Sequence, residues 1–172
     1  MRGTVLYGPR DIRFEDRPEP IIMKPTDAII RLSATCICGS DLWPYRGIQS
    51  IAQPTPMGHE YCGIVEEVGG EVRNIRTGQF VVGSFATSDN TCVVCQHGYQ
   101  SSCVQREFMI TAQASVLRVP LADGTLVATS DLPSKEFVPS LLVTSDVLGT
   151  GWFAADAANV KPGSTAVVVG DG

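Results

Sequence analysis

The stretch Gly58-His59-Glu60-Tyr61-Cys62-Gly63-Ile64-Val65 decides the fold of this chain. From Cys62 to Val68 the residues are mostly apolar and β-branched, which is typical of a buried strand, and Gly69-Gly70 ends the run. His59 stands shortly before this strand, and histidine is a preferred ligand of zinc. The stretch therefore predicts a strand with a candidate metal ligand at its beginning.

Outward from this strand, the first 130 residues read as short strands separated by turns. The expected strands are Gly3–Tyr7, Ile12–Glu15, Asp27–Ala34, Cys62–Val68, Gln79–Phe85, Ser115–Val119 and Leu126–Thr129. Many short strands with frequent turns are typical of a barrel or a sandwich, so we predict a mainly β fold. After Pro133 the pattern changes: Ser134–Leu142 and Gly149–Ala158 are compatible with helices, and Thr165–Val169 reads as a strand of a parallel sheet.

Composition narrows the classes of function. The chain has 172 residues with 13 basic and 18 acidic side chains, a net charge of −5, and 44% hydrophobic residues, which excludes a disordered chain. An acidic pI of about 4.9 argues against nucleic acid or an anionic membrane as the main partner. We see no membrane-spanning run and no signal peptide, so we expect a cytoplasmic protein whose six cysteines serve metal or thiol chemistry.

The strongest chemical signal is the order of two motifs, Cys38-Gly39-Ser40-Asp41 and then Gly58-His59-Glu60. Alone, each is weak evidence, because a single histidine is more often a structural residue. Together they supply thiolate, imidazole and carboxylate groups, and a catalytic zinc takes three such ligands and keeps one position open. The pair of motifs therefore predicts a catalytic zinc site.

With these motifs, the cysteine-containing lobe at 89–103, Val119-Pro120 and the final Val-Val-Val-Gly-Asp-Gly, the chain resembles the N-terminal catalytic domain of the zinc-dependent medium-chain alcohol dehydrogenases. That family joins a GroES-like β-barrel to a Rossmann nucleotide-binding domain. The resemblance covers essentially all 172 residues. It implies a GroES-like catalytic domain at residues 1–132, with a few helices, and a connecting helical segment at 133–172 that ends in the first strand of a truncated Rossmann fold.

The resemblance also assigns roles at the catalytic zinc. Cys38 and His59 match the first two ligands, and Asp146 stands where many members have cysteine, as in the formaldehyde- and polyol-type branches. The alternative for Asp146 is a helix-end or surface carboxylate. The family pattern gives the remaining catalytic roles to Ser40 (proton relay), Asp41 (orientation of His59) and Glu60 (a glutamate near the zinc).

The second cluster is Asp89-x₂-Cys92-x₂-Cys95-x₇-Cys103. It resembles the family's structural zinc lobe, in which four cysteines have this spacing; here Asp89 takes the first position. The alternatives are a lobe that has lost its metal, or one in which His97 replaces a ligand. Outside the pattern, Cys36 and Cys62 are expected to be small buried residues, although an oxidised pair of Cys36 with Cys38 stays open.

Gly170 and Gly172 match the first two glycines of the G-x-G-x-x-G fingerprint for dinucleotides. In this family they imply NAD or NADP as cofactor, held by a Rossmann domain of the full-length protein. The third glycine and the phosphate-binding helix are absent from the 172 residues, so we expect no tight NAD binding by this chain alone.

The leading hypothesis is therefore the catalytic domain of a zinc-dependent alcohol or polyol dehydrogenase, with an alcohol or aldehyde as its small-molecule substrate. The full-length enzyme would transfer hydride from a zinc-bound alkoxide to NAD(P)+ and form a homo-oligomer, whereas the 172 residues alone are expected to be inactive. The alternative is a non-catalytic zinc-binding interaction module, which a genuine stop codon after Gly172 would favour. A zinc-free reductase of the same superfamily is disfavoured by Cys38, His59 and the cysteine lobe.

Overall fold

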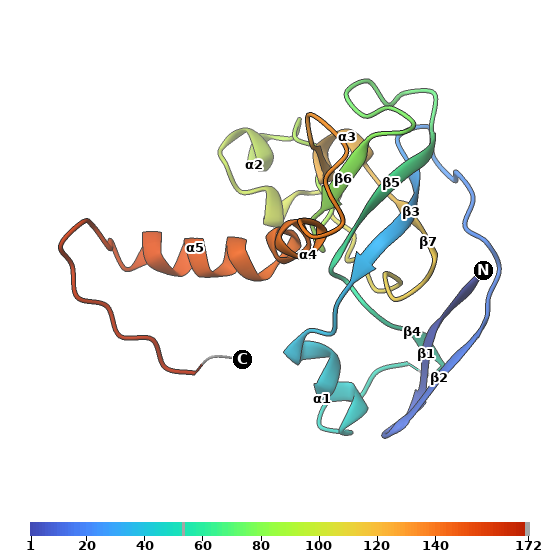
Figure 1. Ribbon diagram of the computed structural model, residues 1–172, viewed down its shortest axis with the longest axis horizontal. Helices are drawn as coiled ribbons and strands as arrows, with labels where there is room; N and C mark the ends of the chain where they lie inside the picture. The colour runs from blue at the N-terminus through green and yellow to red at the C-terminus, as the bar shows by residue number, and fades with distance from the viewer. Residues whose placement is uncertain (53, 171–172) are drawn as a thin grey trace.

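The computed structural model describes residues 1–52 and 54–170. Short strands form where the alternating and β-branched segments predict them, and they build the sheets of the fold (Figure 1). The strands are β1 (Arg2–Gly8), β2 (Asp11–Asp16), β3 (Ala28–Thr35), β4 (Thr55–Pro56), β5 (Tyr61–Val68), β6 (Phe80–Gly83), β7 (Val116–Val119) and β8 (Leu126–Ala128). A mainly β fold is thereby confirmed.

The strands form two antiparallel sheets. The smaller sheet has the order β2-β1-β4, and the larger one has the order β7-β3-β5-β6-β8. Apolar side chains of the larger sheet form the main core, because alternate residues of each strand face the same side. The buried core residues include Ala28, Ile30, Tyr61, Val65, Val81, Leu117, Val119 and Leu126.

The central strand β5 is fixed closely against β3. Their antiparallel register is interrupted between Ile29 and Ile30 and again between Leu32 and Ala34. Near the second irregularity, Gly63 of β5 faces Leu32, and a Cβ atom at Gly63 would lie 2.1 Å from the carbonyl oxygen of Arg31. Only glycine permits this approach, which sets the position of β5 and of the residues that enter it.

The helices are short and lie mainly in the connections. They are η1 (Gly39–Asp41), α1 (Leu42–Tyr45), α2 (Val93–Gln96), η2 (Gln100–Ser102), α3 (Ala122–Thr125), α4 (Val138–Leu142), η3 (Val143–Ser145) and α5 (Val147–Ala157). The expected helix at Ser134–Leu142 is therefore confined to its second half, and the one at Gly149–Ala158 starts slightly earlier. No helix among the described residues is long and apolar enough to cross a membrane.

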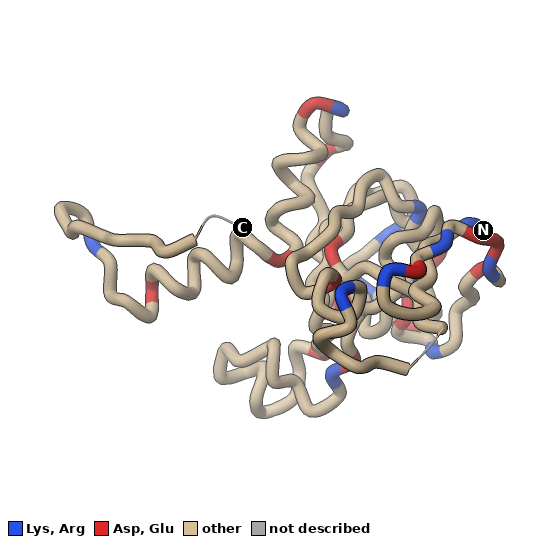
Figure 2. Tube along the Cα trace, turned by 90° about the horizontal axis from the view of Figure 1, so that it is seen from below, with Lys and Arg blue, Asp and Glu red and all other residues tan. Residues whose placement is uncertain are grey.

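Residues 147–170, called the C-terminal arm below, project from the two sheets (Figure 1). Every residue of the arm is exposed, and its charged side chains are Asp156 and Lys161 (Figure 2). The expected strand Thr165–Val169 is wrong for this structure, since the segment has no regular secondary structure. A strand exists only through hydrogen bonds to a neighbour, and no described strand lies beside this segment to pair with it.

Candidate active site and metal centres

Four side chains from distant parts of the chain meet at one end of β5. Ligand atoms of Cys38, His59, Glu60 and Asp146 all lie within 4.8 Å of one another. Cys38 immediately precedes η1, His59 and Glu60 lead into β5, and Asp146 lies between η3 and α5. The structure thus brings together the three residues expected to bind the catalytic zinc and Glu60, which was expected to lie near it.

His59 is held between two carboxylates. Its Nδ1 lies 3.3 Å from Oδ1 of Asp41, and its Nε2 lies 3.6 Å from Oδ2 of Asp146. Asp41 is buried, and its Oδ2 accepts a hydrogen bond of 2.9 Å from the backbone N–H of Cys38. Hydrogen bonding to Asp41, opposed by burial and assisted by Cys38, raises the pKa of His59 to about 9. One carboxylate therefore connects the two predicted ligands Cys38 and His59.

The donor set fits a zinc ion. It offers a thiol, an imidazole and two carboxylates, the groups that zinc prefers. Glu60 is 2% exposed, and its buried Oε2 has no hydrogen-bond partner among the described residues. An unpartnered buried carboxylate oxygen is costly, and a cation beside it removes that cost.

Burial and the nearby Glu60 also raise the pKa of Cys36 to about 12.

A cavity of about 420 Å³ opens beside this cluster. Ser40 and His59 line it together with apolar side chains that the sequence analysis did not single out, namely Pro44, Ile51, Met57 and Ile110. Ser40 itself is exposed. On another side of His59, the ring of Phe85 stands edge-on at 5.9 Å between centroids. Nothing in the local sequence around Phe85 or Ile110 signals these positions, because tertiary contacts alone create them.

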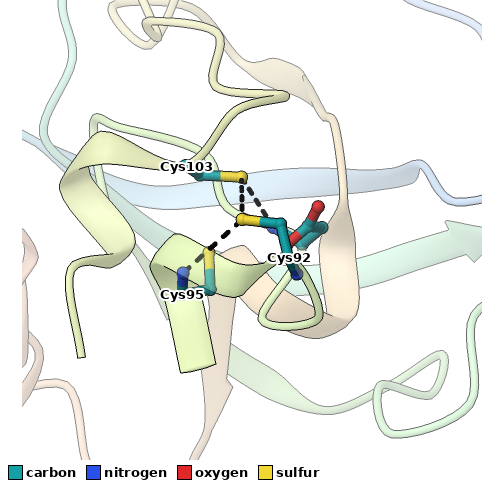
Figure 3. A group of neighbouring side chains, drawn as sticks. Cys92, Cys95 and Cys103 are labelled. Atoms are coloured by element: carbon teal, nitrogen blue, oxygen red, sulfur yellow. Dashed lines mark hydrogen bonds between the residues drawn. The ribbon is translucent and has the colours of Figure 1, made fainter. Parts of the chain in front are cut away.

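The second cluster lies in the loop between β6 and β7. Ligand atoms of Asp89, Cys92, Cys95 and Cys103 lie within 4.8 Å of one another. The sulfur atoms of Cys92 and Cys103 are 4.0 Å apart, and the backbone N–H of Cys95 donates to Sγ of Cys92 at 3.5 Å (Figure 3). Three sulfurs and a carboxylate fit a four-coordinate zinc.

His97, the alternative ligand, is not part of this second cluster: its Nδ1 lies 2.7 Å from the carbonyl oxygen of Val93. Asp89 is instead the fourth member of this cluster. Its Oδ1 accepts hydrogen bonds of 2.9 Å from the backbone N–H groups of Thr91 and Cys92. These backbone bonds hold the pKa of Asp89 well below its usual range, so the group is a carboxylate at neutral pH.

Gly170, one of the two expected cofactor-binding glycines, belongs to neither cluster of candidate ligands among the described residues. Gly170 lies exposed in the C-terminal arm with a φ of 89°, a backbone conformation that favours glycine. Gly172 lies outside the described residues. Their assignment to a dinucleotide stays a prediction.

Two antiparallel sheets with a Cys-His-carboxylate cluster and a cysteine lobe define the class of this protein as a GroES-like domain with candidate metal centres. More closely, residues 24–140 match the family described as the alcohol dehydrogenase GroES-like domain, and the chain belongs to this family.

Relatives and solved structures agree with this assignment. The chain is 36% identical over 163 residues to zinc-type alcohol dehydrogenase B of Aspergillus flavus, covering 92% of this chain and 37% of that protein. It is 33% identical over 180 residues to "Probable D-xylulose reductase A" of Arthroderma otae, covering 98% and 48%. The alcohol dehydrogenase TADH from Thermus sp. ATN1 superposes with a TM-score of 0.86 at 28% identity, covering 95% and 49%. The chain therefore spans about half the length of these relatives or less.

Proposed function

We propose that this chain is the catalytic domain of a zinc-dependent dehydrogenase that oxidises an alcohol or polyol, or reduces the corresponding carbonyl compound, with NAD or NADP. The observation that carries the proposal is the convergence of Cys38, His59 and Asp146 beside a cavity that Ser40 lines. Membership of the alcohol dehydrogenase family supports the reaction type. Its relatives are named as alcohol dehydrogenases and as a xylulose reductase, which supports both alcohols and polyols as substrates.

In this proposal Cys38, His59 and Asp146 hold the catalytic zinc, and Glu60 stands close to it. When bound, zinc acts as a Lewis acid and stabilises negative charge on an oxygen atom. Asp41 fixes the ring of His59 through Nδ1 and so leaves Nε2 to face the cluster. The backbone N–H of Cys38 donates to the same carboxylate, so one group orients two of the three ligands.

Ser40 is proposed to handle the proton. Ser40 lines the cavity and is also exposed, so Oγ can accept the proton of a substrate hydroxyl while its own hydroxyl proton passes to solvent. The apolar walls from Ile51, Met57 and Ile110 would hold the carbon chain of the substrate and exclude water from it.

We further propose a structural zinc at Asp89, Cys92, Cys95 and Cys103, and the division into a catalytic domain at 1–132 and a connecting segment at 133–172. Hydride transfer to NAD(P)+ is proposed for the complete enzyme. The 172 residues alone are proposed to be inactive, since among the described residues no helix N-terminus beside Gly170 offers a phosphate site. A homo-oligomer in the cytoplasm is proposed for the complete enzyme.

Elemental analysis of protein purified without added metal tests the metal centres. We expect about two zinc ions per chain, and one after either His59→Ala or Cys95→Ala. His97→Ala is the matched control, because this exposed histidine lies outside both clusters and its loss should leave the zinc content unchanged. Zinc content that does not respond to His59→Ala would contradict the proposed catalytic site.

Activity is the second test. The protein expressed with any coding sequence that follows codon 172 should oxidise alcohols or polyols with NAD+ or NADP+, and Ser40→Ala should lower kcat by a factor of about 100. Full turnover after removal of zinc, or in the His59→Ala variant, would refute the mechanism. Absence of turnover with any alcohol or polyol would instead favour a non-catalytic zinc-binding module.

A further inference from the structure

Gln105 contacts both ends of the second cluster. Its side-chain Nε2 donates a hydrogen bond of 2.9 Å to Oδ2 of Asp89, and its backbone N–H donates to Sγ of Cys103 at 3.4 Å. The backbone N–H of Asp89 donates to the same sulfur, also at 3.4 Å. Gln105 is exposed, so burial of its side chain gives no reason for this placement. The residue joins the first and the last ligand of the cluster.

The two carboxylate oxygens of Asp89 accept different numbers of hydrogen bonds. Oδ1 accepts two backbone hydrogen bonds, from Thr91 and Cys92. Oδ2 accepts one hydrogen bond from the described residues, that of Gln105. Each hydrogen bond leaves less lone-pair density for a cation, so Oδ2 is the oxygen of Asp89 that is more available to a metal.

We propose that Asp89 binds the metal through Oδ2 and that Gln105 is the positioning residue that aims this oxygen. The inference rests on the proposed metal in the lobe. A carboxylate can turn about its terminal bond and can bind a metal through one oxygen or two. The backbone hydrogen bonds to Oδ1 and the hydrogen bond from the Gln105 side chain to Oδ2 together fix the rotation of the carboxylate and the oxygen that it presents to the metal. Hydrogen-bonding partners of metal ligands commonly have this effect. A thiolate at position 89 would have one donor atom and would need no such aiming.

The proposal is tested by titrating the chain with Co²⁺ in the His59→Ala background, so that the lobe is the site observed. Thiolate-to-cobalt charge-transfer absorption reports binding by the three cysteines, and the ligand-field bands report the fourth ligand. We expect Gln105→Leu to lower Co²⁺ affinity about tenfold and to alter the ligand-field bands. Gln105→Glu keeps the length of the side chain, but its carboxylate cannot donate a hydrogen bond to Asp89. Its Co²⁺ affinity should therefore fall by at least as much as in Gln105→Leu.

Two controls separate aiming from general damage to the lobe. Gln96→Leu alters another exposed amide of the lobe that makes no side-chain hydrogen bond with the described residues, and it should leave binding unchanged. In an Asp89→Cys background, Gln105→Leu should have no effect, since a thiolate needs no aiming.

The outcomes are distinct. Unchanged Co²⁺ binding in Gln105→Leu, or an equal loss in the Asp89→Cys background, would overturn the role of Gln105 while leaving the metal site standing. Absence of charge-transfer absorption in the otherwise unaltered lobe would overturn the proposed structural metal, and the role of Gln105 with it.

Discussion

The buried ion pair between Asp27 and Arg118 offers a sharp test of what holds the larger sheet together. Asp27 lies directly before β3, and its side chain is fully buried. Its Oδ2 accepts a bond of 2.6 Å from Nε of Arg118 in β7 and further bonds from the backbone N–H groups of Met23 and Lys24. The carboxylate thus ties the 23–27 turn to the edge strand of the sheet.

Replacing Asp27 by asparagine keeps the shape and removes the charge. Breaking a buried pair by removing one partner costs about 3–5 kcal/mol, because the other charge is left without compensation. The side chain of Arg118 is 19% exposed and retains some contact with water, so we expect the lower end, about 3 kcal/mol. For a domain of this size, about 2–4 °C is lost per kcal/mol, which predicts a fall in Tm of about 6–12 °C.

Thermal and urea unfolding of the Asp27→Asn variant measure this loss. The matched control is Lys24→Gln, which breaks the exposed ion pair of Lys24 with Glu107, where both side chains are 44% exposed or more. An exposed pair contributes at most about 1 kcal/mol, so the control should change little. The Arg118→Leu variant should remove most of the same interaction, and the double variant should lose less than the sum of the two. A Tm for Asp27→Asn equal to that of the control would refute the reasoning.

Three further predictions concern packing and exposure. Gly63→Ala should lower the free energy of unfolding in urea by about 2 kcal/mol, because the new Cβ atom would clash with the carbonyl oxygen of Arg31. Gly70→Ala is its control, since a Cβ atom there has no neighbour within 4 Å. Equal stability of the two variants would contradict the close approach at Gly63. Burial raises the pKa of Cys62 to about 11, so at pH 8 about one thiol in a thousand is ionised. Mass spectrometry of the native protein should therefore find Cys62 unlabelled by iodoacetamide, and rapid labelling would show that the thiol is accessible. The exposed apolar side chains of Val167, Val168 and Val169 should make the chain self-associate in sedimentation, and a single sharp monomer at tens of micromolar would count against this.

Much of the fold could be predicted because its signals are local. The β-branched run after His59 and the turns between the strands depend on neighbours in sequence, and the observed strands lie close to the expected ranges. Thr165–Val169 shows the limit of such signals. Its composition favours a strand, but a strand forms only where another strand offers hydrogen bonds, and here none of the described strands does.

By itself the sequence determined the identity of the candidate metal-binding groups and their local spacing, as in Cys92 and Cys95, because these are properties of short segments. Only the tertiary structure placed Asp146 against His59 and the side chain of Gln105 against Asp89. These contacts join segments whose separation depends on the fold of the whole chain. It also left the buried Oε2 of Glu60 without a partner. Hydrogen bonds and ligand geometry are decided by positions within a few tenths of an ångström, and those positions are set by packing of the sheets rather than by residue type.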